Sequence, residues 1–376
     1  MTNICNKEIS VIVQGAADKK ITPECLKSIR KFLPGAEIIL STWEGTDASG
    51  LDYDKIVLNK DPGAVLLSVN AGGKKFYNNI NRQLLSTQNG LKETGKKYAF
   101  KIRSDIVLQG AGFLDYFDKY DAYRDPAYSI FKKRILNYYL FTPRYGRAGR
   151  HNVPVLFHPS DWMFFGLTQD LKKLFDIPLQ PEPETTLYWL SRKKPADQAD
   201  AWPATALRYC QEQYLFYSCL KKYYPRVKFE NYMDITREKE DFSRRLMVNN
   251  FTILDFMQWK IKNDKYGHVV GTLPAGQTSH AHWLLEYKKY CNPCLRKPYF
   301  LMLRMLPHAD TNIGYTIDNY VRWFVIKFFK PLYKKNLYRK YSNSPVTLAM
   351  KLQAMENKKA KKIYNEDKQD KEVGHV

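Results

Sequence analysis

Short runs of apolar and β-branched residues alternate with amphipathic stretches over the first hundred residues of the chain. Helical spacing and cap residues predict one helix from Thr22 to about Phe32 and a second over 77–94. Pro23 suits the first turn of the first helix, and Gly95 closes the second. The apolar runs predict four strands, at residues 9–13, 36–41, 55–58 and 98–102. Strands that alternate with helices predict an α/β fold, with a Rossmann-related, mostly parallel sheet flanked by helices.

The carboxyl ends of parallel strands meet at one edge of a sheet, and such proteins bind ligands in the crevice beyond that edge. In this chain the predicted strands end at Val13, Ser41, Leu58 and Ile102. We therefore expect the chemistry to lie just after these four positions.

The pattern is less regular in the middle of the chain. Residues 155–166 predict a pair of strands with a polar break between them, and residues 209–223 predict a helix. The proline-rich and charged stretch 178–203 predicts a long loop, which is a candidate lid over an acceptor. Beyond residue 236 the pattern weakens further.

The composition of the chain predicts an anionic partner. The 376 residues include 60 Lys and Arg against 38 Asp and Glu, a formal charge of +22 that favours phosphate, an acidic membrane surface or nucleic acid. At 44% hydrophobic and 14% aromatic residues, the chain is globular rather than an extended basic tail. It lacks the pattern of a signal peptide and any apolar run long enough to span a bilayer. With six scattered cysteines, these features predict a cytoplasmic protein that can lie on a membrane surface.

The segment Lys101-Ile-Arg-Ser-Asp105, at the end of the fourth predicted strand, is the sharpest candidate for chemistry. A carboxylate at the edge of a sheet suits a divalent ion held against a diphosphate, since Mg²⁺ and Mn²⁺ prefer carboxylate and phosphate oxygens. Arg103 adds positive charge beside it. The alternative is that Arg103 and Asp105 simply pair with each other in a turn.

The context of this segment resembles the central signature of GT-A glycosyltransferases. A polar helix start, a helix, a glycine turn and a strand precede the acid at Asp105. In this resemblance Asn81-Arg82-Gln83 stands for the helix start that touches the nucleotide. Arg103-Ser104-Asp105 stands for the Asp-x-Asp motif, with Arg in place of its first Asp. The resemblance implies that Asp105 is the metal ligand, with Mn²⁺ or Mg²⁺ as the possible ion.

Six motifs in order resemble the WavE family of lipopolysaccharide-synthesis proteins over residues 8 to about 235. The motifs lie at residues 10–15, 28–34, 38–45, 59–63, 81–83 and 101–105. The resemblance implies a bacterial enzyme that transfers a sugar from a nucleotide-sugar donor to the core of lipopolysaccharide or a related surface glycan. We expect inverting chemistry, because it needs only one base.

The expected donor site gathers residues that follow the predicted strands or begin the second helix. Its members are Gln14, Gly15, Glu44, Asp61, Asn81, Arg82, Gln83, Lys101, Arg103 and Asp105.

Asp161 and Glu212 are the candidates for activating the acceptor hydroxyl. Asp161 lies between two apolar runs, and Glu212 begins a predicted helix, where a carboxylate is placed to act as a general base. The alternatives are a turn cap for Asp161 and an ordinary first-turn acid for Glu212. His280 and His282 alternate as in a strand, which would place two imidazoles on one face as possible metal ligands or as surface residues.

We expect three parts along the chain: a GT-A-like domain over 1–235, a mixed extension over 236–318 that completes the acceptor side, and a basic, aromatic, helical C-terminal segment over 319–376. Residues 319–341 combine cations with aromatic rings and predict a peripheral anchor on the cytoplasmic face of the inner membrane. Two other classes of function stay open, a non-catalytic membrane scaffold and a nucleic-acid binding protein, although no recognised nucleic-acid-binding motif appears.

Overall fold

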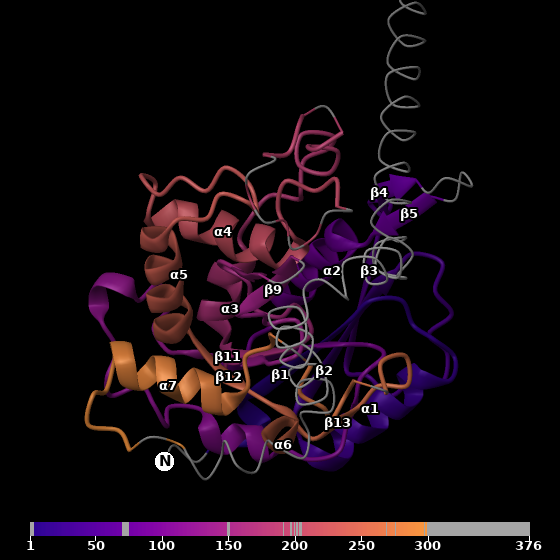
Figure 1. Cartoon of the computed structure of the whole chain (residues 1–376). Helices are drawn as coiled ribbons and strands as arrows, with labels where there is room; N and C mark the ends of the chain where they lie inside the picture. Colours follow the sequence, from indigo (N-terminus) through magenta and orange to yellow (C-terminus); the bar gives the residue numbers. More distant parts are fainter. Residues whose placement is uncertain are drawn as a thin grey trace, which may run out of the picture.

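A seven-stranded sheet forms the centre of the protein, in the order β12-β8-β11-β6-β1-β2-β3 (Figure 1). The computed structural model describes residues 4–298, with gaps at 70–74, 149–150, 191, 196–197, 199, 201, 203–204, 268, 275 and 297. Neighbouring strands pair in parallel except at β11, which is antiparallel to both β6 and β8. The strands of the sheet are β1 (Ile9–Gln14), β2 (Glu37–Trp43), β3 (Lys55–Asn59), β6 (Tyr98–Arg103), β8 (Ile135–Tyr138), β11 (Phe164–Leu167) and β12 (Phe251–Leu254).

Helices flank this sheet, and shorter strand pairs lie at its margins. The helices are α1 (Ile21–Phe32), α2 (Ile80–Lys92), α3 (Thr168–Phe175), α4 (Gln211–Tyr223), α5 (Arg237–Asn250), α6 (Phe256–Trp259) and α7 (His280–Tyr290), with 3-10 turns at Asn6–Glu8, Gly112–Tyr116 and Pro126–Tyr128. The paired strands are β4 (Val65–Val69) with β5 (Lys75–Asn78), β9 (Tyr145–Ala148) with β10 (His151–Pro154), and β7 (Val107–Leu108) with β13 (Ile261–Lys262). The prediction of a Rossmann-like, mostly parallel α/β sheet flanked by helices is confirmed.

Right-handed crossovers explain how the first helices reach the sheet. The chain moves outward from β1 to β2 and β3, then returns through α2 to β6 on the other side of β1. Because such connections are right-handed as a rule, their opposite directions are expected to place α1 and α2 on opposite faces of the sheet. Gly90 lets α2 approach closely, since a Cβ there would lie 2.5 Å from Ile12 Cγ2.

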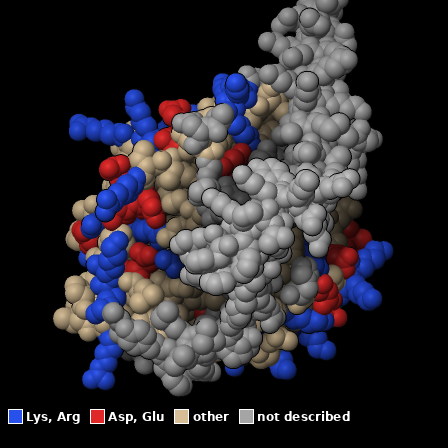
Figure 2. All heavy atoms as spheres, in the orientation of Figure 1, with Lys and Arg blue, Asp and Glu red and all other residues tan. Residues whose placement is uncertain are grey.

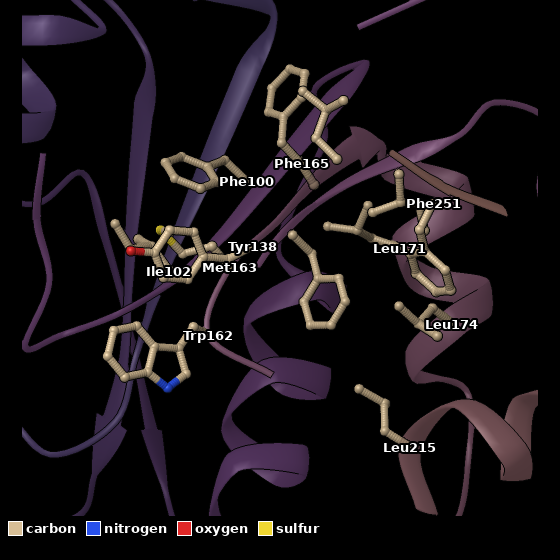
Figure 3. Packing of buried hydrophobic residues seen from close by; sticks show 14 of the residues in the cluster. Phe100, Ile102, Tyr138, Trp162, Met163, Phe165, Leu171, Leu174, Leu215 and Phe251 are labelled. Carbon is tan, nitrogen blue, oxygen red and sulfur yellow. The ribbon is translucent and has the colours of Figure 1, made fainter. Parts of the chain in front are cut away.

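The core is densely aromatic where β6 and β11 meet the helices. Phe113 and Trp259 stack with ring centroids 4.3 Å apart, and Phe100 stacks on Trp259 at 5.7 Å. Such ring pairs stabilise the core beyond their buried area. Figure 3 shows part of this core, including Phe100, Ile102, Tyr138, Trp162, Met163, Phe165, Leu171, Leu174, Leu215 and Phe251.

Several predicted elements differ from the structure. The first helix begins at Ile21 with Lys20 at its N-cap position, so Thr22 is not its N-cap; just before it, Asp18 Oδ1 accepts hydrogen bonds from the backbone N–H groups of Lys20 and Ile21. The second helix starts later than predicted, because residues 75–78 pair with β4 as a hairpin. In the middle of the chain, one strand, β11, stands where the sequence predicts a strand pair over 155–166.

The central sheet extends past residue 235, because β12 pairs in parallel with β8. Among the described residues, no helix is both long enough and apolar enough to cross a membrane. The predicted anchor over 319–341, and the whole of the expected segment 319–376, lie outside the described residues.

Candidate active site

The carboxyl edge of the sheet brings the ends of β1, β2 and β6 together. Gly15 N donates to Ser41 O at 3.1 Å, and Ser104 N donates to Gln14 O at 3.0 Å. Gly15 has a φ of +119°, and a Cβ there would lie 3.1 Å from Ser104 Oγ. The Ser104 hydroxyl donates to Ala16 O at 2.6 Å. These bonds fix the backbone at the edge where the sequence predicts ligand binding.

Arg103 and Asp105 form a two-point ion pair at the end of β6. Arg103 Nε lies 2.9 Å from Asp105 Oδ1, and Nη2 lies 2.5 Å from Oδ2. The guanidinium also lies 5.2 Å from the ring centroid of Trp162, within range of a cation–π interaction. Both side chains are about one quarter exposed. The two residues therefore pair with each other, and the pair faces solvent with an aromatic ring behind it.

Lys101 lies fully buried beneath this pair. Its ammonium donates to the main-chain oxygen of Asp161, and a second contact to Trp162 O measures 3.4 Å. Burial lowers the pKa of Lys101 to about 7, although the negative charge of Asp161 opposes this shift. Asn137, also fully buried, donates to Ser160 O at 2.8 Å. Two buried side chains thus hold the backbone on both sides of Asp161.

Asp161, His158 and Glu212 form a nearly buried polar cluster next to Lys101. Asp161 is 9% exposed, and its carboxylate forms no hydrogen bond within the described ranges. Glu212 Oε2 lies 3.5 Å from His158 Nε2. Burial raises the pKa of Glu212 well above its usual range, and the negative charge of Asp161 raises it further. Burial in this cluster therefore favours the protonated form of Glu212.

His158 is neutral in this cluster. Burial lowers its pKa to about 4, and its Nδ1 donates to Phe141 O at 3.0 Å, so its Nε2 presents a lone pair toward Glu212. Phe141 and Phe157, on either side of this contact, both have positive φ, 64° and 53°. Such backbone strain in bulky residues concentrates at functional sites.

The first turn of α2 lies over the same edge. Gln83 Nε2 donates to Asp161 O at 2.8 Å. Arg82 binds both carboxylate oxygens of Asp61 at 2.8 and 2.6 Å, and this pair is more exposed than Arg103–Asp105. Asn81 is buried and bonds the backbone of Gln180 in both directions. Of the predicted helix start, therefore, Asn81 and Gln83 position neighbouring loops, whereas Arg82 pairs with Asp61.

The other predicted donor residues are spread along the edge. Glu44 follows β2 with an exposed side chain, and its backbone N–H donates to Asn59 O at 2.9 Å. Gln14 is 7% exposed, and its Oε1 is buried without a hydrogen-bond partner. Gln180, which the sequence did not single out, has both amide atoms buried without a partner. Unpaired buried amides are costly, so these two mark places where a ligand or water is expected to bind.

Sequence reasoning missed His158 and Trp162 as members of the site. Both lie in the run His158-Pro-Ser-Asp161-Trp162, so their proximity to Asp161 was available as a signal. What the sequence does not reveal is that Arg103 and Lys101 come from a neighbouring strand to meet this run.

The predicted strand with His280 and His282 is wrong. Both residues lie on α7, where consecutive side chains turn about 100° and cannot share a face at a spacing of two. His280 is buried, with Nδ1 on Ile253 O and Nε2 3.1 Å from the Tyr120 hydroxyl. Over the part of the chain that the structure describes, no group of three or more His, Cys, Asp or Glu is placed to hold a metal ion.

Comparison with protein families matches residues 9–309 to the family described as WavE lipopolysaccharide synthesis. The chain belongs to this family. No curated protein matches the chain. The WavE match includes every strand described above, β12 and β13 among them, so the family relationship extends beyond the first 235 residues.

Proposed function

We propose that this WavE-family chain is a glycosyltransferase that moves a sugar from a nucleotide-diphosphate donor to a hydroxyl of the lipopolysaccharide core or a related surface glycan. The single observation that carries the proposal is the meeting of Asp161 and Glu212 with Arg103 and Lys101 at one edge of the sheet. A carboxylate beside a second acid whose pKa is raised, with fixed positive charge nearby, suits proton removal coupled to departure of an anion.

Asp161 is the base in this proposal. It takes the proton of the acceptor hydroxyl as the acceptor oxygen bonds to the anomeric carbon of the donor sugar. The bond from that carbon to the diphosphate oxygen breaks, and the electron pair leaves with the diphosphate. One base and a direct displacement invert the anomeric configuration.

Glu212 and His158 support this base rather than replace it. The raised pKa favours the protonated form of Glu212, which leaves Asp161 as the proposed base. A protonated Glu212 donates toward the free Nε2 of His158 or toward a bound hydroxyl. The sequence predicts both Asp161 and Glu212 as candidates. The raised pKa of Glu212 favours Asp161 as the group that takes the proton.

Arg103 is the proposed partner of the leaving diphosphate. Positive charge that faces the developing anion stabilises the transition state more than the ground state. Asp105 and Trp162 orient the guanidinium from two sides. In the same proposal Gln14, Gly15, Glu44 and the Arg82–Asp61 pair line the path of the nucleotide, with Lys101 beneath the edge.

The residues around Asp105 do not suit a divalent ion as they are arranged. Both Asp105 oxygens are bonded to Arg103, and a cation would have to displace that guanidinium. No step above is therefore routed through a metal. A requirement for Mn²⁺ or Mg²⁺ at Asp105 stays a prediction, which activity in EDTA tests.

We also propose that the chain works at the cytoplasmic face of the inner membrane. The formal charge of +22 supports attraction to anionic lipids, which weakens as salt increases. Co-sedimentation with anionic vesicles at low salt, lost at high salt or with neutral vesicles, is the expected result. Equal sedimentation with both kinds of vesicle would contradict it.

A panel of nucleotide sugars tests the enzyme proposal. One donor should raise the melting temperature and release its nucleotide when a lipopolysaccharide core acceptor is present. A scaffold or a nucleic-acid binding protein would release none.

A further inference from the structure

A cavity of about 50 Å³ lies between the polar cluster of Asp161, His158 and Glu212 and the helices α5 and α7. Its walls come from segments far apart in the chain: the stretch after β8, the stretch before β11, α5, β12 and α7. The polar residues that the argument uses are Arg144, His158, Ser243, Arg244, Thr278 and Glu286. Apolar side chains complete the lining, with Leu156, Met247, Ile253 and Trp283 among them.

His158 joins this cavity to the polar cluster of Asp161, His158 and Glu212. Its ring lines the cavity, and its Nε2 lies 3.5 Å from Glu212 Oε2. The backbone that carries His158 is held firmly, because Phe157 N donates to Ser243 Oγ at 2.8 Å and Leu156 O accepts from Gln213 at 2.9 Å. His158 is therefore shared by the cavity lining and by the polar cluster that contains Asp161 and Glu212.

Two arginines line the cavity, and only one of them has its hydrogen bonds satisfied. Arg244 donates twice to Glu240, once to Glu286 at 3.0 Å and once to the Tyr145 hydroxyl at 2.9 Å. Arg144, in contrast, has a single 3.6 Å ion pair with Glu286 Oε1, and its buried Nε has no partner. Arg244 therefore has a structural role, whereas Arg144 has N–H donors that can bind a ligand.

Glu286 provides the matching acceptor. Its Oε1 is shared by the two arginines, and its Oε2 is buried with no hydrogen-bond partner. Leaving such atoms unpaired in a folded protein is costly, which indicates that a ligand or water normally satisfies them. A donor on Arg144 and an acceptor on Glu286 face one cavity, beside the hydroxyls of Ser243 and Thr278.

The charge balance of the cavity argues for a neutral ligand. Arg144 and Arg244 are matched by Glu240 and Glu286, so the lining carries no excess positive charge for an anion. Figure 2 shows the same intermixing of blue and red side chains on the side of the molecule that holds α5 and α7. A hydroxyl-rich ring uses paired donors and acceptors together with apolar contacts, which is what this lining offers.

We propose that this cavity receives one hydroxyl-bearing edge of a sugar of the acceptor glycan, with Arg144 donating to and Glu286 accepting from its hydroxyls. The inference rests on the proposed function, and it names the acceptor side of the same site. The sugar enters from the α5–α7 side and presents its reactive hydroxyl past His158 toward Asp161.

Binding of a fluorescently labelled, deacylated lipopolysaccharide core oligosaccharide, measured without any donor, tests this site. Arg144→Met and Glu286→Gln should each raise the Kd at least tenfold, because each loses one hydrogen bond to the sugar. Arg245→Met is the matched control. Arg245 lies on α5 next to Arg244, pairs with Asp241 at 2.7 Å and does not line the cavity, so its Kd should change less than twofold. Melting temperatures near that of the wild type establish that the variants fold.

Wild-type Kd values in both cavity variants would overturn the inference, as would no measurable binding by the wild type. A stabilisation by inorganic phosphate that Arg144→Met alone abolishes would show an anion site and overturn the assignment to hydroxyls. If the variants lose the oligosaccharide and yet no nucleotide sugar is ever turned over, the sugar site stands and the proposed transfer fails. The experiments therefore distinguish failure of the proposed sugar site from failure of the proposed sugar transfer.

Discussion

The centre of the carboxyl edge and its flank use the same arginine–aspartate pairing in different surroundings. At the flank, Arg82 and Asp61 form two bonds with side chains 33% and 42% exposed, where water and salt weaken the pair. At the centre, Arg103 and Asp105 form the same two bonds against Trp162, above a fully buried Lys101 and beside a nearly buried Asp161. Charges removed from water interact more strongly, so the same pairing is expected to matter more at the centre.

The largest effect is expected at Asp161. Asp161→Asn keeps the shape and removes the base, so kcat should fall by about 10³-fold, within the range that general base catalysis supplies. Glu212→Gln is the matched control, because the raised pKa of Glu212 favours its protonated form, and this variant should therefore lose far less activity. The reverse order, with Glu212→Gln the more damaged, would exchange the two roles.

A smaller loss is expected at Arg103. Arg103→Gln removes charge that faces the leaving diphosphate, so kcat/KM should fall by about 10²-fold, with kcat itself affected. Steady-state kinetics with and without Mn²⁺ measure both parameters. Asp105→Asn leaves the Arg103 guanidinium against Trp162. In EDTA this variant should therefore lose less activity than Arg103→Gln. Complete loss of activity in EDTA would instead show that a divalent ion is required.

The buried Lys101 at the centre of the edge should make the stability of the folded protein depend on pH. Its pKa of about 7 in the folded state lies below the ordinary value near 10.4, so the unfolded chain binds more protons between these values. The free energy of unfolding that this group contributes must therefore rise with pH above 7. Relative to Lys101→Met, the wild type should gain roughly 2 kcal/mol between pH 7 and pH 9 in urea denaturation. Parallel curves for the two proteins would show that Lys101 titrates normally.

The smallest effect is expected at the exposed flank. Arg82→Gln should raise the donor KM by about tenfold or less and leave kcat unchanged, because a phosphate contact there is made equally in ground and transition states. The effect should shrink further at high salt. A fall in kcat as large as that of Arg103→Gln would remove the distinction between centre and flank.

The half of the sheet that the sequence predicts well is built from local signals. Strands β1, β2, β3 and β6 have compact apolar runs, and the helices between them have helical spacing. Strand β8 was missed because the buried Asn137 interrupts its apolar run, a polar residue kept to hold the backbone around Asp161. Strand β12 was missed because four residues after a helix give too short a pattern.

The features of the candidate site likewise divide into those that the sequence predicts and those that only the structure reveals. Arg103, Asp105, Asp161 and Glu212 were named because a charge after a strand or at a helix start is visible in the sequence. Whether a side chain is free or already paired depends on contacts between distant segments. That is why the Asn81 bonds to Gln180 and the position of His158 beside Glu212 required the structure.

Mass spectrometry of the acceptor tests the central claim most directly. Wild-type protein, incubated with a lipopolysaccharide core acceptor and each nucleotide sugar in turn, should add the mass of one sugar from one donor. Asp161→Asn should yield no such product in the same time. A folded wild type that adds no sugar from any donor, or an Asp161→Asn variant that adds it at the wild-type rate, would contradict the account.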